Sequence, residues 1–224
     1  MTNAILPAIA RMRPGDHYCG IYRSDAEHRE IITDFVREGV TRHEKIIYLV
    51  NLTTVEQLRA TLAAGGVEVD ALVDRGQLVI MTAREAYLKD GQFDPDRMIG
   101  MLHEETEKAL AEGYSALRAT GEMTWSLAGE PGSERLVEYE SMVNRFFQTQ
   151  QKCYGLCQYD RRRFDSEMLL DILQVHPNVL FGKEGFDNSQ MYYVPPELFL
   201  EHDRLSATLD TWLKNLTIKG VVRA

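Results

Sequence analysis

Short apolar runs alternate with amphipathic segments along most of the chain. Runs rich in Ile, Leu, Val and Tyr predict strands, and segments whose apolar residues recur three and four positions apart predict helices. The predicted strands span residues 17–22, 45–50, 77–82, 115–123, 152–159 and 178–181, and the predicted helices span residues 25–38, 54–66, 69–74, 94–112, 133–150, 165–174 and 197–216. This order of elements predicts an α/β fold.

The predicted fold class is a three-layer α/β structure with a mostly parallel sheet and helices on both faces. Several helix starts carry capping residues, such as Thr54 with Gln57 and Asp94 before Pro95. The chain has no internal repeat, low-complexity segment or linker. We therefore expect one domain over residues 1–224, with its core over about 14–200 and a terminal helix over about 197–216.

The turn after the first predicted strand lacks a phosphate-binding loop. Such a turn binds triphosphate when it reads G-x-x-x-x-G-K-[ST], because glycine amides surround the oxygens and the lysine neutralises them. Here the turn is Arg23-Ser24-Asp25, without glycine or lysine. Ser24 and Glu27 form a predicted capping box, and Asp25 and Glu27 place negative charge at the positive end of the helix dipole. The sequence therefore predicts neither ATP hydrolysis nor strong ATP binding.

Composition excludes several classes of function. The net charge of −9 and the isoelectric point near 5.2 argue against direct binding of nucleic acid or of a membrane surface. No apolar run approaches the roughly 18 residues of a membrane span, and residues 1–13 lack the long apolar core of a secretory signal. We therefore expect a cytoplasmic protein.

The cysteines predict no disulfide and no metal site. Cys153 and Cys157 fall on one predicted strand about 13 Å apart at roughly 3.3 Å per residue, whereas a disulfide needs Cα atoms within about 7 Å. His17 and Cys19 share a face of the first strand, and a neighbouring strand would bring Cys157 close. The chain has no C-x-x-C or H-x-x-x-H spacing, so a buried apolar role is favoured over zinc ligation. We expect no cofactor and no catalytic residue.

A ligand site is predicted at the carboxyl edge of the sheet, where ligands bind in open parallel sheets. The candidate ligand-binding residues end or follow strands one, four and five; they are Tyr22, Arg23, Glu122, Trp125, Tyr159, Asp160 and Arg161. We expect Glu122, Trp125, Tyr159 and Asp160 to form one pocket. The two carboxylates would orient polar atoms of a ligand or, alternatively, form ion pairs with Arg118 and Arg161 in a structural network.

Several separated motifs carry a resemblance to a known family. They are HYCGIY at 17–22, LRATGEMTW at 117–125, Tyr139-Glu140, LCQYDR at 156–161, His176-Pro177 and YVPP at 193–196. In this order they resemble the MEDS domain, the methanogen/methylotroph DcmR-type sensory domain, over about residues 14–200. Residues 35–50 also resemble KaiC/RecA-like ATPases just after their phosphate loop. The resemblance implies a RecA/KaiC-like scaffold without the phosphate loop, and a sensor of small hydrocarbon derivatives.

Two hypotheses of different class follow. The first is a non-enzymatic sensory module for signal transduction or transcription regulation, which binds a small, hydrocarbon-derived ligand at the carboxyl edge of the sheet. The resemblance implies a protein signalling partner for it, either a kinase or a transcription regulator. The second is a RecA/KaiC-like protein that binds or hydrolyses nucleotide with an atypical loop. A pure protein-binding adaptor is a third option. The last helix packs either on the core or on another subunit of a homo-oligomer.

Overall fold

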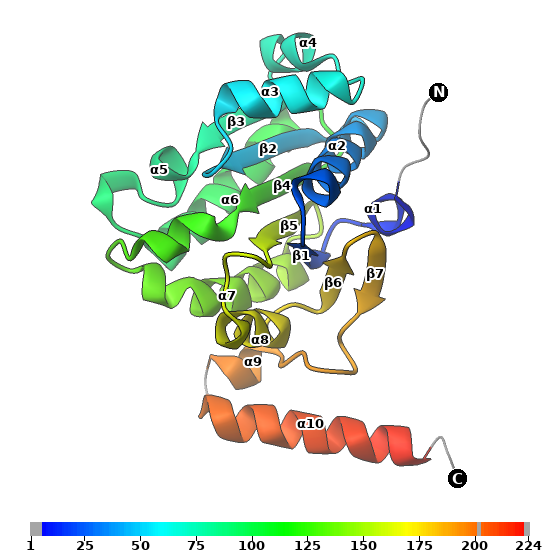
Figure 1. The fold of residues 1–224 in the computed structure, drawn as a ribbon, viewed down its shortest axis with the longest axis vertical. Helices are drawn as coiled ribbons and strands as arrows, with labels where there is room; N and C mark the ends of the chain where they lie inside the picture. The colour runs from blue at the N-terminus through cyan, green and yellow to red at the C-terminus, as the bar shows by residue number, and fades with distance from the viewer. Residues whose placement is uncertain (1–5, 201–202, 222–224) are drawn as a thin grey trace.

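A computed structural model describes residues 6–200 and 203–221 of the chain. Its centre is a seven-stranded sheet with the strand order β3-β2-β4-β5-β1-β6-β7 (Figure 1). The strands are β1 His17–Tyr22, β2 Lys45–Val50, β3 Leu78–Thr82, β4 Leu117–Glu122, β5 Cys153–Asp160, β6 Asn178–Phe181 and β7 Glu184–Asp187. Among the described strands the first six run parallel to one another, and β7 pairs with β6 in the antiparallel direction. The predicted fold class is confirmed.

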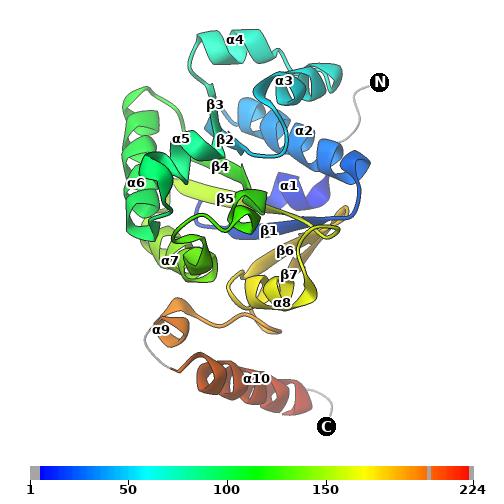
Figure 2. The same cartoon turned by 60° about the vertical axis from the view of Figure 1, so that its left-hand side comes forward.

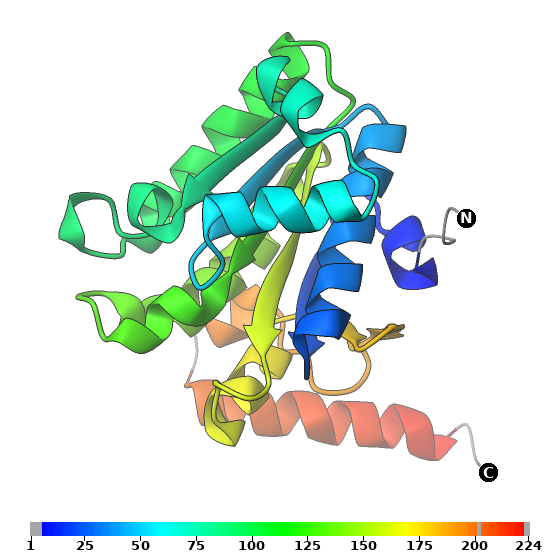
Figure 3. The same cartoon turned by 45° about the horizontal axis from the view of Figure 1, so that its top comes forward.

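Helices cover both faces of this sheet (Figure 2). One face carries α1 Pro7–Arg11, α2 Asp25–Thr41, α3 Val55–Ala64 and α4 Val69–Asp74, whose apolar residues form two core clusters with the strands. Figure 3 shows α2 and α3 lying across the front of the strands. The other face carries α5 Ala83–Ala86, α6 Pro95–Ala111, α7 Leu136–Thr149 and α8 Ser166–Gln174, which share one large core cluster.

The remaining elements are short or peripheral. Three 3₁₀ turns, Lys89–Gly91, Met123–Ala128 and Ser133–Arg135, join the main elements, and α9 Pro196–Phe199 and α10 Arg204–Val221 follow the sheet. Figures 1 and 2 place α10 beyond α9, outside the three layers. Within the described residues, no helix is long and apolar enough to cross a membrane.

The predicted helix starts are built as the sequence indicates. Thr54 accepts a hydrogen bond from the amide of Gln57, whose side chain accepts one from the Thr54 amide in return. Asp94 accepts hydrogen bonds from two amides of the first turn of α6, beside Pro95. These contacts satisfy amides that a helix leaves unpaired at its amino end. Local capping chemistry therefore sets where these helices begin.

Three features of the fold depart from prediction. Neither α1 nor β7 was predicted from the sequence. A signal for β7 was available, because the two-residue loop between β6 and β7 begins with Gly182 at φ +58°. Glycine at that position favours a tight hairpin. The predicted helix over 197–216 is wrong as one element. It is divided into α9 and α10; Asp203, a residue type that favours helix starts, precedes α10. Residues 201–202 of that prediction lie outside the described residues.

Candidate functional site

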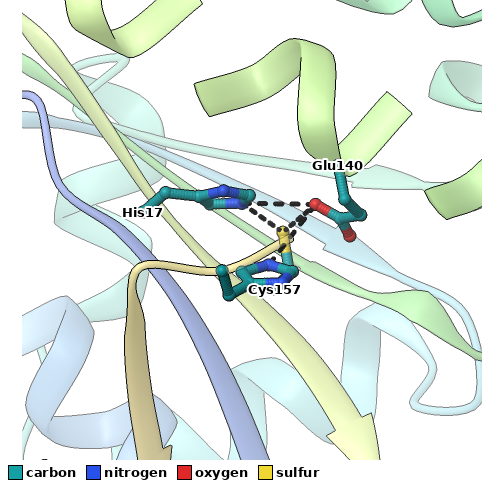
Figure 4. Close-up of side chains that lie close together, drawn as sticks. His17, Glu140 and Cys157 are labelled. Carbon is teal, nitrogen blue, oxygen red and sulfur yellow. Dashed lines mark hydrogen bonds and ion pairs between the residues drawn. The ribbon is translucent and has the colours of Figure 1, made fainter. Parts of the chain in front are cut away.

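Four polar side chains meet inside the apolar core on the α6/α7 face of the sheet. They are His17 from β1, Glu140 from α7, Cys157 from β5 and His176, which follows α8, and one potential ligand atom of each lies within 4.8 Å of all the others. We call this set the buried polar cluster. Figure 4 shows His17, Glu140 and Cys157 pointing toward one another. His17, Glu140 and His176 are at most 1% exposed.

The fold brings these residues together by simple periodicities. Strand β1 pairs in parallel with β5, and Cys19 is in register with Cys157, so His17 and Cys157 lie on the same face of adjacent strands. Helix α7 packs on that face through Leu136, Val143 and Phe147. Glu140 lies four residues after Leu136 and three residues before Val143, so the helical periodicity places its carboxylate on the same buried face of α7.

The distances within the buried polar cluster are short. Glu140 Oε2 lies 3.2 Å from His17 Nε2, 3.3 Å from Cys157 Sγ and 3.5 Å from His176 Nε2. His17 Nε2 lies 3.4 Å from Cys157 Sγ. The other carboxylate oxygen, Oε1, accepts a hydrogen bond from the hydroxyl of Tyr159. One carboxylate oxygen is therefore the centre of the cluster, and the other is fixed by a tyrosine.

Outer contacts fix the orientation of both imidazole rings. Asn144 donates through Nδ2 to the carbonyls of Glu140 and Val175, so its Oδ1 faces His17 Nδ1 at 3.1 Å and must accept a hydrogen bond from it. His176 Nδ1 lies 2.8 Å from the carbonyl of Ile172, which only accepts. When neutral, both rings therefore carry their proton on Nδ1 and present the lone pair of Nε2 to the cluster.

Burial and charge shift the pKa values of the cluster in opposite directions. Burial lowers the pKa of His17, and repulsion from His176 lowers it further, against the attraction of Glu140. Burial alone would raise the pKa of Glu140, but the attraction of His176, and then that of His17, hold it well below its usual range. Burial, and then the charge of Glu140, raises the pKa of the Cys157 thiol well above its usual value. These directions favour an ionised carboxylate beside a protonated thiol.

A small apolar cavity adjoins the buried polar cluster. Its volume is about 30 Å³, and His17 and Cys157 form part of its wall. The rest of the wall is mainly apolar; it includes Ile47 and Leu49 of β2, Ala119 of β4, Met98, Met101 and Leu102 of α6, and Val143 and Phe147 of α7. Apolar walls with a few convergent polar groups are typical of small-molecule sites.

Two of the sequence-predicted site residues are anchored by structural contacts. Glu122 is 2% exposed, and its Oε2 accepts hydrogen bonds from the amides of Asn51, Leu52 and Thr53 at 2.9, 2.7 and 3.0 Å. Trp125 is stacked on Tyr87 with ring centroids 4.7 Å apart. Glu122 Oε1 and Trp125 Nε1 have no hydrogen-bond partner among the described residues. Their role in binding a ligand stays a prediction.

The predicted pocket of Glu122, Trp125, Tyr159 and Asp160 is not formed. Consecutive residues of a strand point to opposite faces, and Tyr159 reaches α7 while Asp160 binds Arg162 on the α2 side. The predicted alternative, ion pairs of these carboxylates with Arg118 and Arg161, is also not formed. Asp160 takes Arg162 instead, and the buried Arg118 pairs with Glu44 at 2.7 Å.

The other predicted ligand-binding residues lie near the surface or make local contacts. Tyr22 is buried and stacks on His28 with centroids 4.3 Å apart. Arg23 pairs with Glu27 and lies over the ring of Phe181. Arg161 contacts the carbonyl of Phe164 and the hydroxyl of Ser166. These three stay predictions as ligand-binding residues.

The turn after β1 is capped by its own side chains. Ser24 Oγ accepts a hydrogen bond from the amide of Glu27 at 3.2 Å, and the Glu27 carboxylate accepts one from the amide of Arg23 at 2.8 Å. Asp25 pairs with Arg162 at 2.6 Å. The predicted cap at Ser24 is confirmed, with the reciprocal bond one residue earlier than in a standard capping box.

Sequence reasoning missed Glu140 and His176 as members of a site. The signal for Glu140 was a carboxylate in the apolar phase of an amphipathic helix, since buried charges are rare without partners. His176 gave no spacing signal, because it lies 159 positions from His17 in the chain. Both, however, stand in motifs that carry the family resemblance.

The comparison with protein families gives the decisive match. The model of the MEDS family, described as "MEthanogen/methylotroph, DcmR Sensory domain", matches residues 16–177. The chain belongs to the MEDS family. All four residues of the buried polar cluster fall within the matched segment.

Relatives of known name or structure agree with this assignment. The transcriptional repressor DcmR of Methylorubrum extorquens is 28% identical over 163 residues, which is 72% of this chain and 58% of the repressor. The chain thus matches little more than half of that relative's length. A KaiC-like protein of Pyrococcus horikoshii aligns over 75% of this chain and 71% of its own, with a TM-score of 0.54 and 10% identity. This second likeness supports the RecA/KaiC-like fold.

Proposed function

We propose that this MEDS-family chain is a sensory module that binds one small apolar molecule in the cavity beside His17 and Cys157. The observation that carries the proposal is an apolar cavity whose polar wall belongs to the buried polar cluster. The proposed ligand lies between the sheet and α6/α7, whereas the sequence predicts a site at the carboxyl edge of the sheet.

The size of the cavity limits the ligand. A volume of about 30 Å³ is about two to three times the roughly 10–15 Å³ that a cavity needs to hold one water molecule, so the site accepts a molecule of very few heavy atoms. Met98 and Met101 line the cavity, and methionine side chains adapt their shape readily. Each further methylene group that is buried adds about 0.8 kcal/mol until the cavity is full. Hydrocarbon derivatives of one to three carbon atoms fit this description.

A titration with short alcohols tests the proposal. Methanol, ethanol, 1-propanol and 1-butanol are added to protein labelled at the methionine methyl groups, and the resonances of Met98 and Met101 are followed by NMR. We expect saturable shifts whose affinity rises with chain length and then falls. Ala119→Val, which adds bulk to the cavity wall, should abolish them, whereas Ala64→Val at an exposed helix position should not. Shifts that are linear in alcohol or unaffected by Ala119→Val would contradict the proposal.

The output of the sensor is proposed to pass through a protein partner. The curated relative is named a transcriptional repressor, and its sequence is longer than the segment it shares with this chain. The partner class is therefore proposed to be a transcription regulator, with a kinase as the alternative. A ligand that changes the helices around the cavity, α6 and α7, is the physical means by which occupancy would reach such a partner.

We further propose that the chain does not hydrolyse nucleotide, although its fold is KaiC-like. The support comes from the turn after β1, where Ser24 and Glu27 occupy the amides that a phosphate would need. Asp25 and Glu27 also place negative charge at the start of α2. Both carboxylates already hold a guanidinium group, Asp25 that of Arg162 and Glu27 that of Arg23, so phosphate binding at that position would have to break these ion pairs.

A further inference from the structure

We propose that the buried polar cluster is a metal site that holds one divalent transition-metal ion of the zinc class. Its donors are Nε2 of His17, Nε2 of His176, Sγ of Cys157 and Oε2 of Glu140. This departs from the metal-free protein expected from the sequence. The inference stands on the cluster alone and does not depend on the proposed function.

Four of the six separations between donor atoms are close to those around a tetrahedral ion, and all six lie within 4.8 Å. With zinc bonds of about 2.0–2.1 Å to nitrogen or oxygen and about 2.3 Å to sulfur, adjacent donors lie about 3.3–3.6 Å apart. The observed separations are 3.2 and 3.5 Å from Glu140 Oε2 to the two histidine nitrogens, 3.4 Å from His17 to Cys157 and 3.3 Å from Cys157 to Glu140. The side chains therefore need only small shifts to surround an ion.

The buried polar cluster has fewer hydrogen-bond donors than acceptors. Both neutral imidazoles donate through Nδ1 to outer partners, so each presents a lone pair inward. An ionised Glu140 adds further acceptors, and Cys157 supplies a single S–H proton. His176 Nε2 accordingly has no hydrogen-bond partner among the described residues. A buried atom of this kind costs free energy when it is left unsatisfied, and a cation satisfies several such lone pairs at once.

The charges of the cluster balance a divalent ion. Two neutral imidazoles, one thiolate and one carboxylate carry two negative charges, which a divalent cation cancels. Neutrality matters here because Glu140 and both histidines are at most 1% exposed, and an uncompensated buried charge is costly. A mixed nitrogen, sulfur and oxygen donor set suits zinc and its neighbours rather than magnesium or calcium.

The outer contacts are those that metal sites use to hold their ligands. Asn144 orients His17, the Ile172 carbonyl orients His176, and Tyr159 donates to the free oxygen of Glu140. Ligating histidines generally donate their second nitrogen to such acceptors, which fixes the tautomer and the ring. Because His17 and Cys157 also line the apolar cavity, the ion would lie at its wall.

Cobalt binding tests the proposal on the whole chain. Protein is stripped with a chelator and titrated with Co²⁺ alone, and absorption spectra report tetrahedral geometry and thiolate-to-cobalt charge transfer. We expect one ion per chain, a charge-transfer band, and displacement by Zn²⁺. Cys157→Ser should lose the band and weaken binding more than about 100-fold, beyond the 10–100-fold cost of losing an outer partner. Cys153→Ser removes a buried thiol from the same face of the same strand and should retain both band and affinity.

The outcomes separate the alternatives. A folded wild-type chain that gives no charge-transfer band with Co²⁺ overturns the proposal, as does a band that survives Cys157→Ser. If Cys157→Ser does not fold by circular dichroism, the double variant Cys19→Ser/Cys153→Ser decides, because Cys157 is then the sole cysteine. A band retained in that variant supports the assignment, and its loss contradicts it. These readouts require no small-molecule ligand, so they stand or fall separately from the alcohol titration.

Discussion

Glu122→Gln should destabilise the fold, because the carboxylate of Glu122 holds the loop that follows β2. Its Oε2 accepts hydrogen bonds from three consecutive amides, those of Asn51, Leu52 and Thr53, while the side chain is 2% exposed. A hydrogen bond to a charged group contributes about 1.5–3 kcal/mol, and one between neutral groups about 0.5–1.5 kcal/mol. Replacing the carboxylate oxygen by an amide oxygen therefore costs about 1 kcal/mol per bond.

Three such bonds give an expected loss of about 3 kcal/mol in the free energy of unfolding. For a chain of this size, that loss lowers Tm by about 6–12 °C. The assay is urea unfolding of Glu122→Gln, with the midpoint lowered and the slope unchanged. Glu134→Gln makes the same chemical change at an exposed position and should stay within about 0.5 kcal/mol of wild type.

Unchanged stability of Glu122→Gln would show that its three hydrogen bonds do not hold the loop. If Glu122 serves chiefly as a ligand-binding carboxylate, neutralising it in a buried place relieves a desolvation cost and leaves stability equal or higher. Wild-type stability in Glu122→Gln would therefore return this residue to the list of candidate ligand contacts.

Three further predictions concern the fold and its charges. Arg118→Met should lower the free energy of unfolding by about 3–5 kcal/mol, because it leaves the buried Glu44 carboxylate without the guanidinium that now lies 2.7 Å away. Urea unfolding measures this loss, and a loss under about 1 kcal/mol would show that the ion pair is dispensable. The free energy of unfolding of the metal-free chain should fall as pH drops below the unfolded pKa of histidine, near 6.5, and again below that of glutamate, near 4.3. The lowered pKa values of His17 and Glu140 mean that the unfolded chain takes up protons more readily than the folded chain. Urea midpoints across pH should show a shallower acid decline in Glu140→Gln, and an identical decline would contradict this assignment. Magnesium and ATP should produce neither phosphate release above background nor calorimetric binding, whereas turnover that is lost on changing Glu122 or Asp160 would revive the nucleotide hypothesis.

Much of the fold could be predicted because its signals are local. Residues 17–22, 45–50, 69–74 and 178–181 have the predicted bounds, since apolar runs and caps act within a few residues. The predicted pocket failed for a reason that the sequence already contained. Tyr159 and Asp160 are neighbours on one strand, so they cannot face the same side of the sheet.

The buried polar cluster could not be predicted in the same way, because its members come from β1, α7, β5 and the loop after α8. Spacing rules detect ligands that share a helix or a turn, and none of these four residues lies near another in the chain. The strand pairing of β1 with β5 brings His17 to Cys157, and only the packing of α7 and α8 adds Glu140 and His176. Their convergence is a property of the tertiary structure.

The proposed function requires that a small apolar molecule occupies the cavity beside His17 and Cys157. A crystal structure of the chain under xenon pressure tests it most directly, because xenon enters dry apolar cavities and gives a strong density peak. We expect a xenon atom between the β2 residues Ile47 and Leu49 and the α6 residues Met98 and Met101. It also predicts that the peak is lost in Ala119→Val. Xenon found only in the open apolar groove near Leu170 and Phe186, with none in this cavity, would contradict the claim.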